Sequence, residues 1–124
     1  MLPVSNSILL VEDEPVLILT LEELLLDEGC RVQIAQNGTD AINALEAGES
    51  FDVLVTDIRL PHVNGWEIAR RARELLPDLP VIYMSGDSTA EHGANGVSCS
   101  VMLSKPFALD NFLQVVTAAM PGAR

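Results

Sequence analysis

The sequence predicts an α/β protein built on a doubly wound, five-stranded parallel sheet, and two observations lead to this class. First, short apolar runs alternate with helix-spaced apolar patterns five times along the 124 residues, which is typical of a parallel sheet covered by helices on both faces. Second, the 48% apolar and 20% charged content is that of a compact protein, and a chain of this length can bury a core without disulfides. We therefore expect one domain over residues 1–124.

The first four expected elements are two strands, each followed by a helix. Ser7–Val11 is a continuous apolar run of strand length, and Pro15 opens a segment whose leucines recur at helical spacing until Gly29 ends it. Arg31–Ala35 alternates polar and apolar residues, as an edge strand does. Residues 39–47 then show a short helical pattern.

The middle of the chain should supply the centre of the sheet. Residues 51–56 form a strand whose core, Val-Leu-Val, is apolar on both faces, as central parallel strands are. A third helix is expected after Pro61 and ends before Pro77, which its geometry cannot accommodate. Residues 80–84 are the fourth expected strand.

The last expected elements are less regular. Residues 88–98 should hold a fourth helix, but Gly93 and Gly96 weaken it and few apolar side chains offset them. A short fifth strand is expected over residues 101–103, followed by a helix whose apolar face runs through residues 109–116. We expect residues 88–98 to be a short or irregular helix that responds to signals.

Charge and cysteine content exclude several functions. The formal net charge is -11 and the pI is about 4.3, so the protein repels nucleic acid and anionic lipid and favours a divalent cation. Cys30 and Cys99 have no metal-type spacing, so we expect both to be reduced packing residues of a cytoplasmic protein. The N-terminal segment lacks the features of a signal peptide, and no apolar run is long enough to span a membrane.

Polar side chains follow the strands at the positions where a doubly wound sheet binds ligands. Glu12 and Asp13 follow the first strand, Asp57 the third, Ser85 the fourth and Lys105 the fifth. Taken singly, each has an ordinary role as a helix cap or a solvated surface group. Together, the converging carboxylates would repel one another unless a cation lay between them, and oxygen ligands suit Mg²⁺.

A carboxylate beside such a cation can act as a nucleophile toward phosphorus and form an aspartyl phosphate. Phosphoryl transfer needs neutralisation of the equatorial oxygens, for which Lys105 offers a positive charge and Ser85 a hydroxyl donor. The sequence contains no glycine-rich phosphate loop, so it gives no indication of a bound nucleotide.

Five segments resemble the landmarks of response regulator receiver domains of bacterial two-component systems: ILLVEDEP, VLVTDIRLP, HVNGWE, VIYMSGD and LSKPF. The resemblance covers nearly the whole chain and implies a flavodoxin-like receiver fold with strand order 2-1-3-4-5. It also implies that Glu12 and Asp13 form the acidic metal pair, that Asp57 is phosphorylated and also a metal ligand, and that the backbone carbonyl of Arg59 completes the Mg²⁺ site. The strand-four and strand-five segments are further similar to single-domain receivers common in alphaproteobacteria.

The resemblance also implies roles for the remaining site residues and for partners. Ser85 would be the switch hydroxyl, and Lys105 would contact the phosphoryl group. The donor would be a histidine kinase or phosphotransfer protein, and the chain would catalyse only its own phosphorylation and dephosphorylation. With no output domain, it would signal by contact with an unknown downstream protein or act as a phosphate sink.

The sequence departs from the receiver pattern at a position that receivers use in signalling. Receivers usually carry Tyr or Phe three positions before the strand-five Lys, and here that position is Met102. A flexible Met cannot perform the usual aromatic two-position switch, although simple core packing explains it equally well. Elsewhere, His62 and His92 are expected to be isolated exposed loop residues, and Trp66 to be packing or partly exposed surface.

Two alternative functions remain open from the sequence. A phosphohydrolase acting on outside substrates is disfavoured, because the position two residues after Asp57, where such enzymes carry an acid, is Arg59. A pseudo-receiver adaptor that no longer accepts phosphate is the other alternative. We also expect Arg59 and Asp87 to pair over the phosphoryl site and hinder the water needed for hydrolysis.

Overall fold

The protein forms a single five-stranded parallel sheet covered by helices on both faces, which confirms the predicted fold class. The computed structural model describes residues 6–86 and 92–121. The strands lie in the order β2-β1-β3-β4-β5, as predicted. Their bounds are β1 Ser7–Val11, β2 Arg31–Ala35, β3 Val53–Asp57, β4 Val81–Ser85 and β5 Ser100–Ser104.

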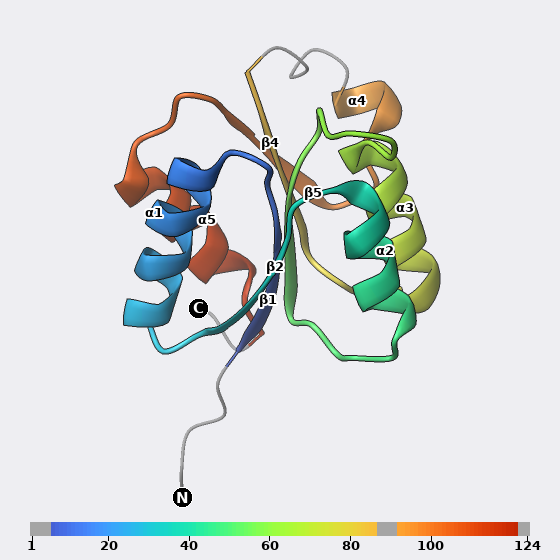
Figure 1. Ribbon diagram of the computed structural model, residues 1–124, viewed down its shortest axis with the longest axis horizontal. Coiled ribbons are helices and arrows are strands. Elements are labelled where there is room, and N and C mark those ends of the chain that lie inside the picture. Colours follow the sequence, from blue (N-terminus) through green and yellow to red (C-terminus); the bar gives the residue numbers. More distant parts are fainter. Residues whose placement is uncertain (1–5, 87–91, 122–124) are drawn as a thin grey trace, which may run out of the picture.

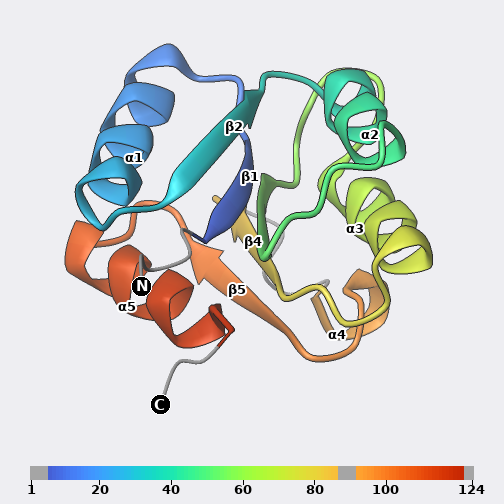
Figure 2. The same cartoon turned by 90° about the horizontal axis from the view of Figure 1, so that it is seen from below.

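The helices divide between the two faces. Helices α1 and α5 cover one face, and α2, α3 and α4 lie on the other (Figures 1 and 2). Their bounds are α1 Pro15–Asp27, α2 Gly38–Glu46, α3 Gly65–Leu75, α4 His92–Asn95 and α5 Leu109–Ala119. None of the helices in the described part of the chain is long and apolar enough to cross a membrane.

Alternation along the strands separates the apolar core into two layers. On β1, Ile8 and Leu10 join the cluster under α1 and α5, whereas Leu9 and Val11 join the cluster under α2 and α3. Every residue of β3 and β4 is buried, as expected for strands packed on both faces. The burial of both faces therefore fixes the register that brings the strand ends together.

Local signals set most helix limits. Pro15 occupies the first turn of α1, and Gly29, with φ of 85°, follows its end as predicted. Asn37 and Asn64 cap α2 and α3, accepting hydrogen bonds from the backbone N–H groups of Asp40 (2.8 Å) and Glu67 (3.0 Å). These caps determine where the loops at the carboxyl edge of the sheet end.

The strand ends differ from the expected limits for one physical reason. The apolar runs suggested that the third and fourth strands end at Thr56 and Met84, but Asp57 pairs with Met84, and Ser85 pairs with Ser104. Backbone pairing therefore continues past the last apolar residue into the polar ones. The polar residues at these ends are thus held by the sheet.

One expectation about a single residue needs correction. Cys30 is buried as expected, but Cys99 is exposed and does not pack in the core. Cys99 also has a positive φ of 56°, because it lies in the turn that leads into β5, where the chain reverses at the surface. His62 is exposed, as expected.

Candidate functional site

The carboxyl ends of β1, β3, β4 and β5 bring the predicted site residues to one edge of the sheet (Figure 1). Glu12 and Ser85 are each 1% exposed, and Asp57 is 7% exposed. Burial of such polar groups costs free energy, so their presence here needs a compensating interaction or a function. They are the polar residues on which the site is built.

Lys105 connects two of the buried carboxylates. Its Nζ atom lies 2.9 Å from Oε1 of Glu12 and 3.2 Å from Oδ2 of Asp57. The other oxygen of Glu12, Oε2, accepts a hydrogen bond of 3.1 Å from the backbone N–H of Glu14. Lys105 thus joins the ends of β1 and β3 from the far edge strand.

Three carboxylates lie close enough to hold one cation together. Carboxylate oxygens of Glu12, Asp13 and Asp57 all lie within 4.8 Å of one another. Asp13 is exposed whereas the other two are buried, so the group opens to solvent on one side. Hard oxygen donors with room for water match the coordination that Mg²⁺ prefers, so the residues present fit this ion.

Burial makes the negative charge of this group unfavourable in the metal-free protein. Burial raises the pKa of the Asp57 carboxyl, and the charge of Lys105 offsets only part of this effect. Burial also raises the pKa of Glu12, against the hydrogen bond from Lys105. For Lys105, burial opposes the charged form, but the bond to Glu12 and the charge of Asp57 outweigh it and raise its pKa. The ammonium therefore stays charged beside an excess of carboxylates.

The loop after Asp57 is packed tightly against the start of α3. The hydroxyl of Thr56 donates to the carbonyl of Asp57 over 2.8 Å, and the N–H of Gly65 donates to the carbonyl of Ile58 over 2.8 Å. A side chain on Gly65 would collide with the carbonyl oxygen of Asp57 and the Cα atom of Ile58. Glycine is therefore required at this position to let the backbone of Asp57 lie where it does.

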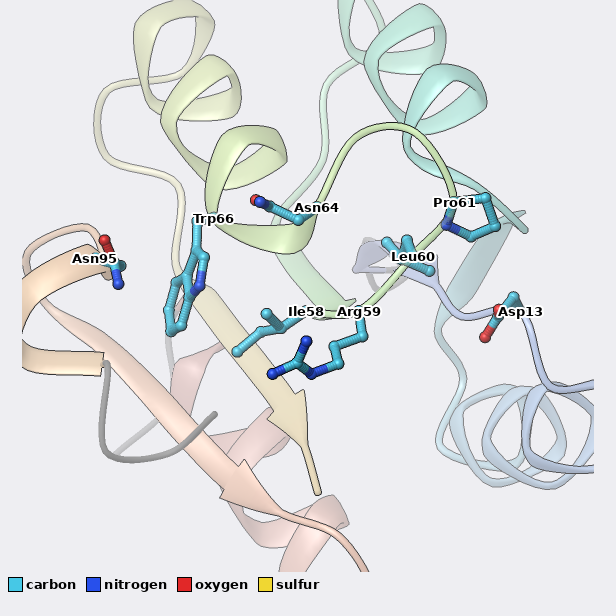
Figure 3. A pocket seen from close by; sticks show the side chains of 8 residues that line it. All are labelled: Asp13, Ile58, Arg59, Leu60, Pro61, Asn64, Trp66 and Asn95. Carbon is cyan, nitrogen blue, oxygen red and sulfur yellow. The ribbon is translucent and has the colours of Figure 1, made fainter. Parts of the chain in front are cut away.

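An open pocket of about 550 Å³ adjoins the carboxylates. Figure 3 shows Asp13 at one end of this pocket, and Trp66 and Asn95 at the other end. Its lining residues come from the loops after β1 and β3, the start of α3, and α4: Asp13, Ile58, Arg59, Leu60, Pro61, Asn64, Trp66 and Asn95. Through Asp13, this pocket adjoins the side on which the carboxylate group opens to solvent.

The structure brings together most, but not all, of the predicted site. Glu12, Asp13, Asp57 and Lys105 form one contiguous group. Ser85 lies at the adjoining end of β4, and its carbonyl accepts a 2.7 Å hydrogen bond from the backbone N–H of Lys105. Arg59 lines the pocket, and the role of its carbonyl stays a prediction. Asp87, and with it the expected Arg59–Asp87 pair, lies outside the described residues.

Sequence reasoning missed an aromatic cluster beside this pocket. His92, expected to be an isolated loop residue, lies in α4, and its Nε2 is 2.8 Å from Oγ of Ser100. Its ring lies 5.6 Å from the ring of Tyr83 and 6.5 Å from that of Trp66, which is buried. The three rings come from α3, β4 and α4. Spacing within one element cannot reveal such a cluster, because it depends on how separate elements pack.

Comparisons with known proteins agree with the fold. The response regulator receiver domain model matches residues 8–117. The chain is 34% identical over 116 residues to the probable transcriptional regulator ycf29 of Pyropia yezoensis, covering 90% of this chain and 52% of that protein. It is 33% identical over 109 residues to the transcriptional regulatory protein CusR of Escherichia coli, covering 86% of this chain and 48% of CusR. The chain thus spans about half the length of these relatives.

Solved structures give the same result. A response regulator receiver protein from Sinorhizobium medicae superposes with a TM-score of 0.91 at 37% identity, covering 97% of this chain and 98% of that one. The receiver domain of sensor histidine kinase PA1611 from Pseudomonas aeruginosa, whose structure has a magnesium ion coordinated in the active-site cleft, gives a TM-score of 0.79 at 28% identity, covering 92% and 96%. The five-stranded order, the acidic cluster and these matches together show that the chain belongs to the response regulator receiver domain family.

Proposed function

We propose that this protein is a phosphoacceptor receiver in which Asp57 takes a phosphoryl group from a phosphohistidine of a histidine kinase or phosphotransfer protein. The observation that supports this most directly is the position of Lys105, whose ammonium reaches both Asp57 and Glu12 in a largely buried site. A carboxylate held beside a cation, in a group that opens to solvent on one side, is arranged for attack on an incoming phosphorus atom.

The proposed reaction exchanges one bond to phosphorus for another. A carboxylate oxygen of Asp57 forms a bond to phosphorus while the bond to the donor's imidazole nitrogen breaks, and that nitrogen keeps the electron pair. Lys105 then contacts an oxygen of the phosphoryl group in place of the Asp57 oxygen it now binds. The Ser85 hydroxyl, at the adjoining strand end, donates to another phosphoryl oxygen.

Glu12, Asp13 and Asp57, with the carbonyl of Arg59, would hold Mg²⁺. When bound, the ion would neutralise charge on the phosphoryl oxygens. The excess of carboxylates over ammonium within this group is the reason that a divalent cation is needed. Receiver domains bind Mg²⁺ in an acidic pocket of this kind.

Helix α1 offers the surface on which we expect the donor to dock. It starts three residues after Glu12, and its exposed apolar residues are Val16 (72% exposed), Leu19 (63%) and Leu26 (52%). Its charged residues are all acidic, including Glu22 and Glu23. A partner helix with apolar and basic side chains, carrying the phosphohistidine, would fit this surface and reach Asp57.

We further propose that the chain acts as a single receiver over residues 1–124. The described residues form one sheet with its helices, and its signal would pass by protein contact or end in hydrolysis of the aspartyl phosphate, as in a phosphate sink. The net charge of -11 argues against direct contact with nucleic acid or anionic lipid. It would catalyse no reaction beyond its own phosphorylation and dephosphorylation, and we propose that it acts in the cytoplasm.

Mass spectrometry after incubation with acetyl phosphate and Mg²⁺ tests the central proposal. We expect a gain of one phosphate that Asp57→Asn abolishes, whereas Asp110→Asn, an exposed aspartate in the first turn of α5, leaves it intact. A wild-type protein that gains no phosphate and binds no Mg²⁺ would instead be a pseudo-receiver adaptor.

The donor surface has a separate test. Leu19→Glu should slow phosphorylation by a histidine kinase while leaving phosphorylation by acetyl phosphate unchanged, because only the protein donor contacts α1. Leu75→Glu, at an exposed apolar position at the end of α3, is the matched control. Equal slowing by both variants would place the docking surface elsewhere.

A further inference from the structure

An aromatic residue, Tyr83, lies on β4 in this protein, where it pairs directly with Met102 of β5. Tyr83 is the cross-strand partner of Met102, it is fully buried, and it precedes Ser85 by two residues on the same strand. Residues two apart on a strand point to the same face. Tyr83 and Ser85 therefore lie on one face of β4, toward α3 and α4.

Tyr83 is in contact with two of the three helices on that face, α3 and α4. Its ring centroid lies 4.7 Å from that of Trp66 at the start of α3 and 5.6 Å, edge-on, from that of His92 in α4. Its hydroxyl oxygen accepts a 3.0 Å hydrogen bond from the backbone N–H of Val97. A rigid side chain with these contacts transmits displacement of its own strand to α4.

Both backbone polar groups of Val97 are hydrogen-bonded. The N–H is bound by Tyr83, and the carbonyl accepts a 2.6 Å hydrogen bond from the hydroxyl of Ser100. Since that hydroxyl proton is used, Nε2 of His92 must donate to Oγ of Ser100 over the 2.8 Å between them. His92 in turn packs on Gly96, where any side chain would collide with its ring.

Few other hydrogen bonds of the described residues hold the connection between α4 and β5, residues 95–100. Arg70 donates to the carbonyl of Asn95 over 3.2 Å, and Arg73 to that of Cys99 over 3.5 Å, and both bonds lie at the surface. Helix α4 contains no buried residue. Tyr83, by contrast, is a fully buried side chain that hydrogen-bonds to this segment at Val97.

We propose that Tyr83 couples the phosphorylation site to the α4–β5 connection, residues 95–100, in place of an aromatic residue on β5. The inference rests on the proposed function of Asp57. Displacement of Ser85 toward a phosphoryl oxygen moves the end of β4 and carries Tyr83 with it. The Tyr83–Val97 hydrogen bond then lengthens, and the α4–β5 connection loosens. Met102, an unbranched side chain, repacks around the new position of the ring.

Amide hydrogen exchange with and without Mg²⁺ and beryllofluoride, which mimics the phosphoryl group, tests the coupling. In the wild type we expect the Val97 amide to exchange about fivefold faster with the mimic, as for loss of one hydrogen bond. Tyr83→Phe keeps the ring and removes the hydroxyl, so exchange should already be fast and the mimic should change it by less than about twofold. Met102→Leu is the matched control across the strand pair and should respond as the wild type does.

Each outcome has a definite meaning. A wild-type response in Tyr83→Phe, or loss of the response in Met102→Leu, would overturn the coupling through Tyr83. Ser100→Ala removes the hydrogen bond to the carbonyl of Val97 without changing a buried residue. It is the substitute variant if Tyr83→Phe fails to fold, and it should also speed exchange of the Val97 amide without the mimic. Phosphate gain on Asp57, measured by mass in parallel samples that receive acetyl phosphate and Mg²⁺ but no beryllofluoride, separates the two proposals: without it both fail, and with it an unchanged Val97 amide overturns the coupling alone.

Discussion

The two halves of the sheet contribute differently to this protein. The first half, β1 to β3, supplies all three carboxylates of the acidic cluster and is covered by α1 and α2, of 13 and 9 residues. The second half, β4 to α5, supplies Ser85 and Lys105, and the described part of its α4 is four residues long with none buried. The carboxylates that we propose as metal ligands thus follow strands covered by two full helices. The groups proposed to contact the phosphoryl oxygens belong to the half that contains the short α4.

This difference separates binding from response within one small domain. Residues that must hold an ion in a fixed geometry benefit from rigid packing around them. Residues that must report a new phosphoryl group benefit from neighbours that can move at small cost. The predictions below test whether the two halves differ in this way.

The largest difference should appear in the free energy of unfolding. Leu21 of α1 is fully buried under the first half, so Leu21→Ala should lower that free energy by about 3 kcal/mol. His92→Ala in α4 should lower it by about 1 kcal/mol, because the ring is only half-buried. Urea denaturation followed by Trp66 fluorescence measures both, and equal losses would erase the contrast between the halves.

The acidic cluster should oppose folding in the absence of Mg²⁺. Burial raises the pKa of Asp57. The Asp57 carboxyl therefore contributes its full stability to the fold below its unfolded pKa of about 3.9. This contribution is lost as pH rises through the folded pKa. Asp57→Asn should therefore raise the free energy of unfolding at pH 7 by on the order of 1 kcal/mol. The gain should vanish as pH falls below the unfolded pKa. A constant gain across that range would mean that charge is not its cause.

Tyr83 permits a test in the second half at alkaline pH. Burial raises its pKa, and it is the only tyrosine, so near-ultraviolet absorbance of tyrosinate reports one site. We expect ionisation above the unfolded value of about 10. The corresponding stability is present below that value and is lost as pH rises through the folded pKa. Titration at the value of an unfolded tyrosine would show that the aromatic cluster opens readily.

The smallest effect is expected at the surface of α3, between the halves. Arg71 lies 2.9 Å from carboxylate oxygens of both Glu46 and Glu74, but all three side chains are well exposed. Arg71→Gln should leave the free energy of unfolding almost unchanged, since solvent and salt screen such pairs. Thermal melts at low and high salt provide the check, and a large loss would show that these surface pairs are not screened.

The sequence was sufficient to predict the fold class and the convergence of the carboxylates. Apolar periodicity identified the strands, and strand ends in a parallel sheet converge by geometry, which brought Glu12, Asp57 and Lys105 together. The third and fourth strands extend one residue beyond their predicted ends, to Asp57 and Ser85, because backbone pairing does not require apolar side chains. The weak helix expected over residues 88–98 is a single short turn in its described part.

The cluster of Trp66, Tyr83 and His92 could not be predicted, because it depends on the relative placement of three elements. No periodicity within α3, β4 or α4 specifies which rings meet across them. Cys99 was misassigned for a similar reason. Its apolar character suggested burial, but the turn into β5 places it at the surface.

The unequal burial of the two cysteines has a practical consequence for spectroscopy. Cys30 is shielded in the core, where burial first and the nearby charge of Glu28 second raise its thiol pKa, while Cys99 is exposed immediately before β5. A maleimide dye should therefore attach to Cys99 selectively in the natural chain, without engineered cysteines. With the single Trp66 as energy-transfer donor, the labelled protein would report α4–β5 rearrangements in real time during phosphorylation.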